Sequence, residues 1–383
     1  WIKIGLLSFG GPAAQIALMH RMVVEERQWL TERQYLNALS FCMLLPGPEA
    51  MQLATYAGWR LHGIAGGLAA GLAFVLPGAS VVLALSMVYA SFGNVPLVEA
   101  IFLGVKAAVL VIVIEALLRI AKRALDGNEA WLLAALSFVG IFFLALPYPL
   151  IVLAAAICGF LRAGTTVDAS VPPPEKLERS TAGTIATIAV WLAIWMVPLL
   201  ALGWALGFDH KLAQLGYFFS KLAVVTFGGA YAVLAYMGQD VVTRLGWLEA
   251  GQMMDGLGLA ETTPGPLILV TEFVGYVAAW RDGGIALGLA GAAVSLWATF
   301  APCFLWIFAA APYVEWINAQ PRLKGALSAI TAAVVGVILN LGIWFGLHVF
   351  FGTVTRVEAG PLTLWTPEIA TLDWRVVALA VLS

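Results

Sequence analysis

Long apolar runs recur along the chain and alternate with short polar segments. The clearest runs span residues 64–91, 97–121, 184–207, 284–311 and 323–350. Each is long enough to cross the hydrocarbon core of a bilayer, which takes about 20 residues of α-helix. We therefore predict a transmembrane helix over each of these ranges.

Glycine and proline interrupt the apolar pattern at particular places. Residues 42–54 read CMLLPGPEAMQLA, with a Pro-Gly-Pro sequence inside an apolar stretch, and residues 8–12 read SFGGP. Proline removes a backbone donor and breaks the helical hydrogen-bond ladder. A helix that only had to span the bilayer would gain nothing from such a break, so the breaks indicate a function.

The chain contains an internal repeat. A shift of 218 positions aligns residues 3–48 with residues 221–266, and sixteen of the 46 columns are identical. The identities include the FGG and PGP segments of both copies. After an insertion of seven residues the alignment continues at an offset of 225, which places Pro77 on Pro302. These matches predict a duplicated protein.

The two copies define the domain organisation that we predict. The first repeat covers residues 1–161 and the second covers residues 211–383. Between them we predict a polar, proline-rich linker at 162–183 and an additional transmembrane helix at 184–210. We expect both ends to be trimmed, because the chain begins without methionine and stops within an apolar run.

Basic residues indicate how the two copies are oriented. If the FGG and PGP elements both enter and leave on the same side, an odd number of crossings precedes the second copy, which is then inverted. The basic loops in that case all face the cytoplasm, as the positive-inside rule requires. These residues are Arg21, Arg27, Arg33, Arg119, Lys122, Arg123, Arg162, Lys176 and Arg179. We predict an inverted-topology repeat with broken or re-entrant helices, and parallel copies remain open if only one of the two elements crosses.

Composition places the whole chain in the membrane. Hydrophobic residues make up 62% of the 383 residues, charged residues make up 11%, and the mean hydropathy is +0.93. A soluble globule of this size would need more polar surface. The predicted fold class is an all-α integral membrane protein, a polytopic helical bundle of two homologous halves. The net charge of −2 and the absence of a basic block give no reason to expect a nucleic-acid partner.

The sequence contains no motif for a metal or a cofactor. The three cysteines include no CxxC pair, the four histidines include no HExxH, and no P-loop is present. The segment GLGLAE at 256–261 lacks the third glycine of a dinucleotide fingerprint. We therefore expect no metal, no cofactor, no ATP as a direct energy source and no enzymatic activity.

The four breaks predict a substrate site. In transporters built from inverted repeats, interrupted helices of both copies commonly form the site near the midplane of the membrane. Helix N-termini present free N–H groups and the positive end of the helix dipole, so they bind anions. The predicted substrate-binding residues are Gly10, Gly11, Pro12, Gln15, Pro46, Gly47, Pro48, Gln52, Lys106, Thr226, Gly228, Gly229, Thr262, Thr263, Pro264, Gly265 and Pro266.

Two carboxylates beside the breaks, Glu49 and Glu261, are predicted to act in coupling or gating. A carboxylate within a membrane segment is costly and is by default a functional candidate. Glu49 can also simply cap the half-helix that follows it. The hydroxyl groups have a similar alternative, because such groups often bond to their own helix. Lys106 can neutralise a dianion, or it can pair with Glu99 or Glu115.

Four segments resemble the chromate ion transporter family, in its form with two fused homologous domains. They are SFGGPAAQIALMHR at 8–21, LLPGPEAMQLATYAGW at 44–59, TFGGAYAVLAYM at 226–237 and TTPGPL at 262–267. The resemblance covers essentially the whole chain. It implies a secondary carrier of the bacterial inner membrane that exports chromate from the cytoplasm and confers chromate resistance. The implied partners are chromate and the lipid bilayer, and a homodimer remains open.

The two copies differ at positions within these motifs. Pro12 is replaced by Ala230 and Glu49 by Leu267 in the second copy, so we expect the halves to have unequal roles. A sulfate or other oxyanion permease is the alternative function, because sulfate has the shape and charge of chromate. An intramembrane enzyme or a scaffold would have no reason to repeat the breaks in matched pairs. The driving gradient, proton antiport or membrane potential, remains open.

Overall fold

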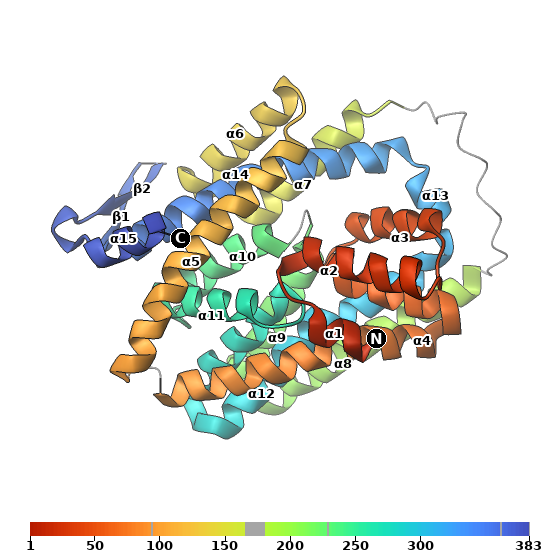
Figure 1. The fold of residues 1–383 in the computed structure, drawn as a ribbon, viewed down its shortest axis with the longest axis horizontal. Coiled ribbons are helices and arrows are strands. Elements are labelled where there is room, and N and C mark those ends of the chain that lie inside the picture. The colour runs from red at the N-terminus through yellow and green to blue at the C-terminus, as the bar shows by residue number, and fades with distance from the viewer. Residues whose placement is uncertain (93–94, 165–180, 228–229, 361, 383) are drawn as a thin grey trace. The chain divides into compact units, whose positions relative to one another are not determined.

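The computed structural model describes residues 1–92, 95–164, 181–227, 230–360 and 362–382. Its backbone is almost entirely helical (Figure 1). The helices group into two compact units, and each unit is assembled from separate stretches of the chain. Unit 1 comprises residues 1–91, 166–230 and 259–321, and unit 2 comprises residues 92–165, 231–258 and 322–383.

Unit 1 contains both PGP segments and the residues that precede both FGG segments. Its elements are α1 (Ile2–Leu7), α2 (Gly11–His20), the π-helix η1 (Arg21–Glu26), α3 (Glu32–Leu44), α4 (Glu49–Phe92), α8 (Thr181–Leu206), α9 (Lys211–Val225), the end of α11 (Ala250–Thr262), η3 (Leu267–Leu269), α12 (Val270–Ala310), η4 (Ala311–Tyr313) and α13 (Val314–Asn318). Glycine and proline set several of these boundaries. Pro12, for example, lies in the first turn of α2, where its missing N–H costs no hydrogen bond.

α4 is a helical hairpin and not a straight span. Its backbone leaves the helical region at His62 and Gly63, and Gly63 has a φ of +63°. The carbonyl of Gly58 then lies against Gly66, although a straight helix would hold these two residues about 12 Å apart. The chain therefore folds back, and we call residues 49–62 the first limb of α4 and residues 63–92 its second limb.

α12 folds back in the same way in the second copy. Its backbone turns at Gly283 and Gly284, and Gly284 has a φ of +68°. The carbonyl of Gly275 lies against Gly291 across this turn. We call residues 270–283 the first limb of α12 and residues 284–310 its second limb. Glycines facing one another let the two limbs of each hairpin approach closely, as they do between membrane helices.

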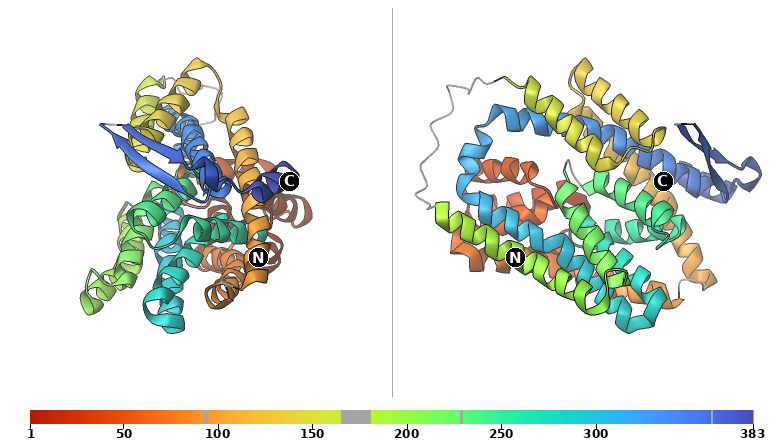
Figure 2. Two further views of the ribbon diagram at one scale, coloured as in Figure 1. Left: turned by 90° about the vertical axis from the view of Figure 1, so that its left-hand side faces the viewer. Right: turned by 180° about the vertical axis from the view of Figure 1, so that it is seen from behind.

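The hairpin of α12 packs against the helix that links the two copies. In unit 1, α8 runs alongside the second limb of α12 (Figure 2). The indole Nε1 of Trp297 donates to the carbonyl of Trp195 at 3.2 Å, and the rings of Trp195 and Trp306 meet edge to face. The additional helix predicted at 184–210 is therefore a helix over Thr181–Leu206.

Matching positions of the two copies adopt matching local structure. α2 continues into η1, and α10 (Ala230–Gln239) continues into the π-helix η2 (Asp240–Arg244). After η1 the amide of Trp29 donates to the carbonyl of Val23 at 2.8 Å, and after η2 the amide of Trp247 donates to Val241 at 2.9 Å. Both donors and both acceptors are 218 positions apart, so the backbone repeats at the offset found in the sequence.

Unit 2 is a second group of helices with a small β-hairpin. Its elements are α5 (Pro96–Ala124), α6 (Asn128–Phe142), α7 (Tyr148–Arg162), α10, η2, the start of α11, α14 (Pro321–Phe350), β1 (Val354–Ala359), β2 (Leu362–Pro367), η5 (Ile369–Thr371) and α15 (Trp374–Leu382). Small residues let α14 approach its neighbours: Gly325 lies against Gly159 of α7, and Gly336 lies against Ala134 of α6. The antiparallel pair of β1 and β2 is the part of this fold that an all-helical expectation left out.

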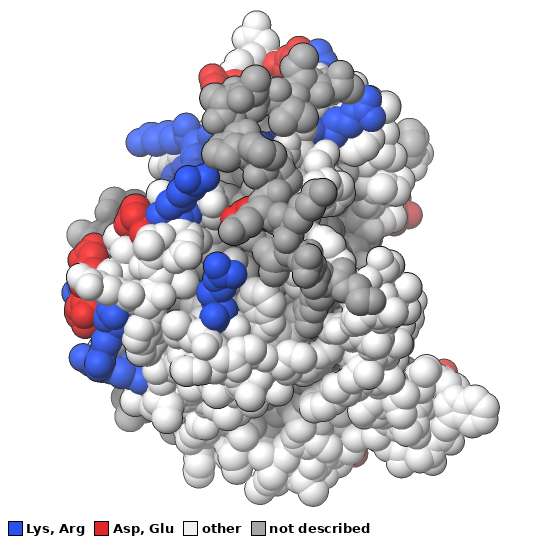
Figure 3. Space-filling view, turned by 90° about the vertical axis from the view of Figure 1, so that its right-hand side faces the viewer, with Lys and Arg blue, Asp and Glu red and all other residues white. Residues whose placement is uncertain are grey.

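Four helices of the described structure are long and apolar enough to cross a membrane. They are α4, α8, the continuous segment Leu267–Asn318 and α14. The predicted spans 64–91, 184–207, 284–311 and 323–350 fall within them, and 97–121 falls within α5. The face in Figure 3 shows wide areas without charged side chains. The chain is therefore an all-α, multi-pass membrane protein, as its composition predicted.

The compact units do not follow the predicted repeats. Unit 1 joins residues 1–91 of the first copy to residues 259–321 of the second. Exchanged hydrogen bonds between the breaks, described below, join these two stretches. Most of the predicted linker, residues 165–180, lies outside the described residues.

Candidate functional site

The first break separates α1 from α2. Gly10 and Gly11 have φ values of +80° and +75°, a left-handed conformation that glycine adopts because it has no Cβ. α2 begins at Gly11, with Pro12 in its first turn. The first N–H groups of α2 therefore lie outside any helical ladder.

The second break separates α3 from α4. Leu45 is extended, with φ −91° and ψ 148°, because a residue that precedes proline is disfavoured in the helical region. Gly47 has a φ of +121°, and α4 begins at Glu49. In the second copy Gly265 has a φ of +98° in the same Pro-Gly-Pro context. Glycine is required at both places because other residues rarely adopt these φ values.

The breaks of the two copies hold each other by exchanged hydrogen bonds. The amide of Gly47 donates to the carbonyl of Thr226 at 2.9 Å, and the amide of Gly265 donates to the carbonyl of Ser8 at 2.9 Å. Ser8 and Thr226 precede the FGG segments of their copies, and the two bonds are related by the repeat offset of 218. Each PGP break is thus anchored on the residue before the other copy's FGG break.

This exchange differs from one expectation. Gly47 and Gly265 were predicted to expose their amides to a substrate, and in this conformation both amides are bonded to protein carbonyls. The physical reason is that a backbone donor in a membrane interior has no water to bond and needs a partner within the protein.

Each PGP break also packs against the proline-containing helix of the other copy. A Cβ on Gly47 would lie 3.0 Å from Sγ of Cys303, and a Cβ on Gly265 would lie 3.1 Å from Cα of Gly78. Gly78 and Cys303 each follow the proline inside their helix, and they are related by the second offset of 225. Residues related by the offset of 218 and residues related by the offset of 225 therefore lie together at this site.

The two predicted glutamines bond to the breaks in this conformation. Nε2 of Gln15 donates to the carbonyl of Gly265 at 2.7 Å and approaches that of Ser8 at 3.4 Å. Nε2 of Gln52 donates to the carbonyl of Pro46 at 2.7 Å, while its Oε1 is buried without a partner among the described residues. Each side-chain amide thus supplies a donor to a backbone carbonyl of a PGP break.

The hydroxyl groups mostly bond to their own helices. Oγ of Ser8 donates to the carbonyl of Ile4 at 2.6 Å, and Oγ1 of Thr226 donates to that of Leu222 at 2.6 Å. Thr262 makes the corresponding contact to Leu259 at 3.3 Å. This is the alternative that membrane helices routinely allow. Oγ1 of Thr263 differs, since it is buried without a partner in the described structure.

A small cavity lies where the starts of α2 and α4 meet η3. It is lined by Pro12, Gln15, Pro48, Glu49, Ala50, Pro266, Leu267 and Ile268. Its volume is about 20 Å³, which is room for about one water molecule. Pro48 and Pro266 are equivalent in the repeat, whereas Glu49 faces the apolar counterpart Leu267. The cavity is therefore polar on the side of the first copy only.

Two helix N-termini and a neutral donor lie beside Glu49 at this cavity. The N-termini of α2 and α4 carry the positive ends of two helix dipoles, and Gln15 adds the neutral donor. A tetrahedral oxyanion has five heavy atoms and does not fit a volume suited to one water.

Three groups of predicted residues are not among those described at this cavity. Gly228 and Gly229 lie outside the described residues. Lys106 belongs to α5, and its side chain is also outside the described part. Glu261 is half-buried near the end of α11, outside the lining of the cavity.

Sequence reasoning missed two buried carboxylates, Asp255 and Glu272. Glu272 lies in the first turn of α12 with a side chain only 1% exposed, and its Oε2 has no partner among the described residues. The carboxylates that were predicted, Glu49 and Glu261, both lie beside the breaks. A glutamate six positions after Pro266 in an otherwise apolar segment was the available signal.

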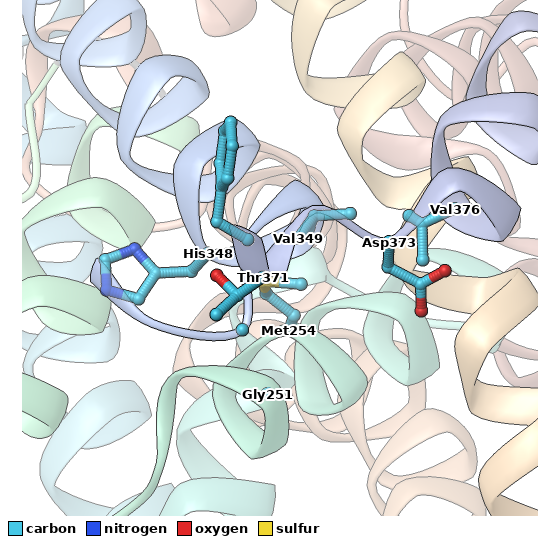
Figure 4. Close-up of a pocket in the computed structure, with 9 residues that line it drawn as sticks. Gly251, Met254, His348, Val349, Thr371, Asp373 and Val376 are labelled. Carbon is cyan, nitrogen blue, oxygen red and sulfur yellow. The ribbon is translucent and has the colours of Figure 1, made fainter. Parts of the chain in front are cut away.

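Unit 2 contains a larger cavity of about 250 Å³ (Figure 4). Its lining comes from α11, the end of α14, η5 and α15, and it includes His348 and Asp373. Nδ1 of His348 lies 2.9 Å from the carbonyl of Trp344. None of the predicted site residues lines this cavity.

The chain is similar in sequence to a family of known proteins over both repeats. The family described as Chromate transporter matches residues 1–160 and 213–383. A chromate transport protein of Cupriavidus metallidurans is 34% identical over 339 residues, which cover 88% of this chain and 79% of the relative. A chromate transport protein of Pseudomonas aeruginosa is 33% identical, covering 88% and 77%.

A probable chromate transport protein of Synechococcus elongatus is 30% identical over 90% of this chain and 83% of its own length. No solved structure matches the chain. The family is one of transport proteins, which excludes an enzymatic role. The match over both repeats, together with paired breaks that hold each other, places this chain in the chromate transporter family.

Proposed function

We propose that this chain is a secondary transporter that exports chromate from the cytoplasm across the inner membrane of a bacterium. The exchanged hydrogen bonds between the breaks carry this proposal, in a chain of the chromate transporter family. Two equivalent breaks that hold each other suit alternating access, because the site lies between related elements that can move in turn.

The substrate is held at the starts of α2 and α4. Chromate is a dianion with four oxygens, so its site must supply several donors. The first N–H groups of both helices supply donors together with positive dipole ends. Gln15, which now donates to the carbonyl of Gly265, exchanges that acceptor for a chromate oxygen when the PGP breaks separate.

Glu49 controls the charge of the cavity. When it is ionised it repels a dianion, and when it is protonated it permits binding. The membrane potential already favours export of negative charge by about 2.3 kcal/mol per charge per 100 mV. A proton at Glu49 is therefore a gate for binding and release, and it is not needed to make export favourable.

Uptake of labelled chromate by inverted membrane vesicles tests the substrate and the direction. We expect uptake above that of vesicles without the protein, and little competition by sulfate. Strong competition by sulfate would favour a general oxyanion permease. No uptake of either ion would contradict a transport role for the site.

The variant Glu49→Gln tests the gate. Glutamine mimics the protonated carboxyl, so we expect chromate uptake that no longer varies between about pH 6 and about pH 8, the range that physiological proton switches use. Glu315→Gln is the matched control, because Glu315 is exposed on α13 and does not line the cavity. Identical pH profiles for wild type and Glu49→Gln would leave Glu49 as a helix cap.

A further inference from the structure

The carboxyl group of Glu272 is isolated in the interior of unit 1. Its side chain is 1% exposed, and its Oε2 makes no hydrogen bond in the described structure. No basic side chain of the described residues forms an ion pair with it. A helix start alone would explain a glutamate in this turn, but it does not explain a buried carboxyl oxygen without a partner.

Other buried polar groups accompany Glu272 inside the α12 hairpin. Oγ1 of Thr299 donates to Oγ1 of Thr271 at 3.2 Å, and Thr271 donates to the carbonyl of Ile268 at 2.9 Å. Tyr276 lies one turn beyond Glu272, and its hydroxyl is buried without a described partner. Glu272, Gly275 and Tyr276 share one helix face, which faces the second limb because Gly275 packs on it. We call Thr271, Glu272, Tyr276, Ser295 and Thr299 the hairpin polar cluster.

The first copy has the same hairpin without a carboxyl at this position. Gly58 and Gly66 face each other in α4 as Gly275 and Gly291 do in α12, so Thr55 corresponds to Glu272. Oγ1 of Thr55 donates to the carbonyl of Met51 at 2.9 Å, and α4 folds back at its glycine kink as α12 does. The carboxyl of Glu272 is therefore not needed to form the hairpin, and an ionisable group buried in a membrane segment is by default a functional candidate.

The neighbouring elements bring no charge to balance an ionised Glu272. The second limb of α12 and α8 contain no charged residue, and the second limb of α4 offers only Tyr89, whose ring meets Phe273. On α9, Lys211 pairs with Asp282 at 3.5 Å and Lys221 is exposed. The remaining titratable groups on the hairpin are Tyr276, Arg281 and Cys303. Because an uncompensated buried charge is costly, Glu272 is protonated in this conformation.

We propose that Glu272 is a proton-binding site of the transport cycle, filled in this closed conformation and emptied to water when the α12 hairpin moves. This inference rests on the proposed transport function and adds a second carboxyl to it, in the other copy from Glu49. The link to substrate is short: Glu272 follows the break at Gly265 through η3, and Ile268 both lines the cavity and accepts a hydrogen bond from Thr271. Separation of the breaks therefore displaces the turn that carries Glu272.

Infrared spectroscopy of the reconstituted full chain tests the site without transport. We expect the carbonyl band of a protonated carboxylic acid to persist at neutral pH, far above the ordinary glutamate pKa of about 4.3. The band should lose intensity in Glu272→Gln and keep its intensity in Glu315→Gln. Glu272→Thr is a second variant that the hairpin accommodates, since Thr55 occupies the equivalent place in α4. An unchanged band in both Glu272 variants overturns the proposal.

Chromate uptake under an imposed pH gradient tests the coupling. One pH unit is a tenfold ratio of protons, so we expect up to about a tenfold change in wild-type uptake. The gradient should change uptake by Glu272→Gln less than it changes wild-type uptake, because Glu49 is still present, whereas Glu315→Gln should respond as the wild type does. An undiminished gradient response in Glu272→Gln, or no response in an active wild type, overturns the proposal. Absence of all chromate uptake would instead contradict the proposed function, and the infrared result would still decide whether Glu272 holds a proton.

Discussion

At the scale of single residues, the site depends on the glycines of the Pro-Gly-Pro turns and on the glutamine side chains that bond to those turns. The sequence identified Gly47 and Gly265 from their Pro-Gly-Pro context, and both have a positive φ as such a turn requires. It also singled out Gln15 and Gln52 as donors. Their acceptors could not be predicted, because Gln15 bonds to a carbonyl of the other copy and only the fold brings Gly265 to it.

Alanine at Gly47 should destabilise the protein and abolish transport. A Cβ there would lie 2.8 Å from Nε2 of Gln52 and 3.0 Å from Sγ of Cys303, at a φ of +121°. Strain of this kind costs about 1–3 kcal/mol, and a shift of the turn would break the bond to Thr226. We expect a lower melting temperature in detergent and loss of chromate uptake.

Gly183→Ala is the control for this substitution. Gly183 lies in α8, has no atom near the position of an added Cβ and does not have a positive φ. Alanine favours a helix over glycine by up to about 1 kcal/mol, so this variant should be at least as stable as the wild type. Normal stability and uptake by Gly47→Ala would contradict the role given to the PGP turn.

At the scale of elements, the sequence predicted which segments are helical, but it did not predict where the long helices fold back. The apolar runs 64–91 and 284–311 are the second limbs of α4 and α12. The apolar stretch around residues 42–54 is divided by the break into α3 and the first limb of α4, which continues to a turn at His62 and Gly63. A glycine in an apolar run does not by itself predict that the chain reverses direction. The turn is stabilised by packing between the two limbs, which meet only once the chain has folded back.

The pair α2 and α3 is linked by ionisable groups at its end. His20 contacts Glu25 through Nδ1 at 3.1 Å and Glu32 through Nε2 at 2.6 Å. The hydrogen bond and charge of Glu32, with the charge of Glu25, raise the pKa of His20 above its ordinary 6.5. The protonated histidine therefore stabilises this link between the end of α2 and the start of α3.

This link predicts a pH dependence of stability. Because the pKa of His20 is raised in the folded state, its contribution is complete below about pH 6.5 and is lost as the pH rises through the raised value. We expect the melting temperature of the wild type to fall relative to His20→Gln over that interval. Parallel melting curves for the two proteins across the interval would contradict the contribution of His20.

At the scale of the whole molecule, the sequence duplication is also visible in the structure, as equivalent contacts between the two copies. The exchanged bonds of Gly47 and Gly265 relate the two breaks by the sequence offset. A twofold axis exchanges such partners both when it lies in the membrane plane, as in an inverted repeat, and when it lies along the membrane normal, as in a parallel repeat. The orientation itself stays a prediction.

Cysteine labelling tests this orientation. Glu25 and Thr243 are equivalent positions, and both are exposed at the π-helices that follow α2 and α10. Cys42 and Cys303 are buried, so Cys158 is the cysteine to replace before Glu25→Cys or Thr243→Cys is introduced. In an inverted repeat an impermeant thiol reagent reaches the two cysteines from opposite sides of the membrane. Labelling of both from one side would establish parallel copies, and permeabilised cells provide the control for reactivity.

The sequence alone determined that this protein is helical, lies in the membrane, is duplicated and is interrupted at matched breaks. These properties are local: hydropathy sets a span, glycine and proline set a break, and a repeat is visible as identity at a fixed offset. The tertiary structure decided that the carbonyls of Thr226 and Ser8 accept hydrogen bonds from the amides of Gly47 and Gly265, and that Glu272 is buried. Such pairings join residues far apart in the chain. They depend on which buried donor reaches which acceptor once water is excluded, and no local pattern of residues encodes that choice.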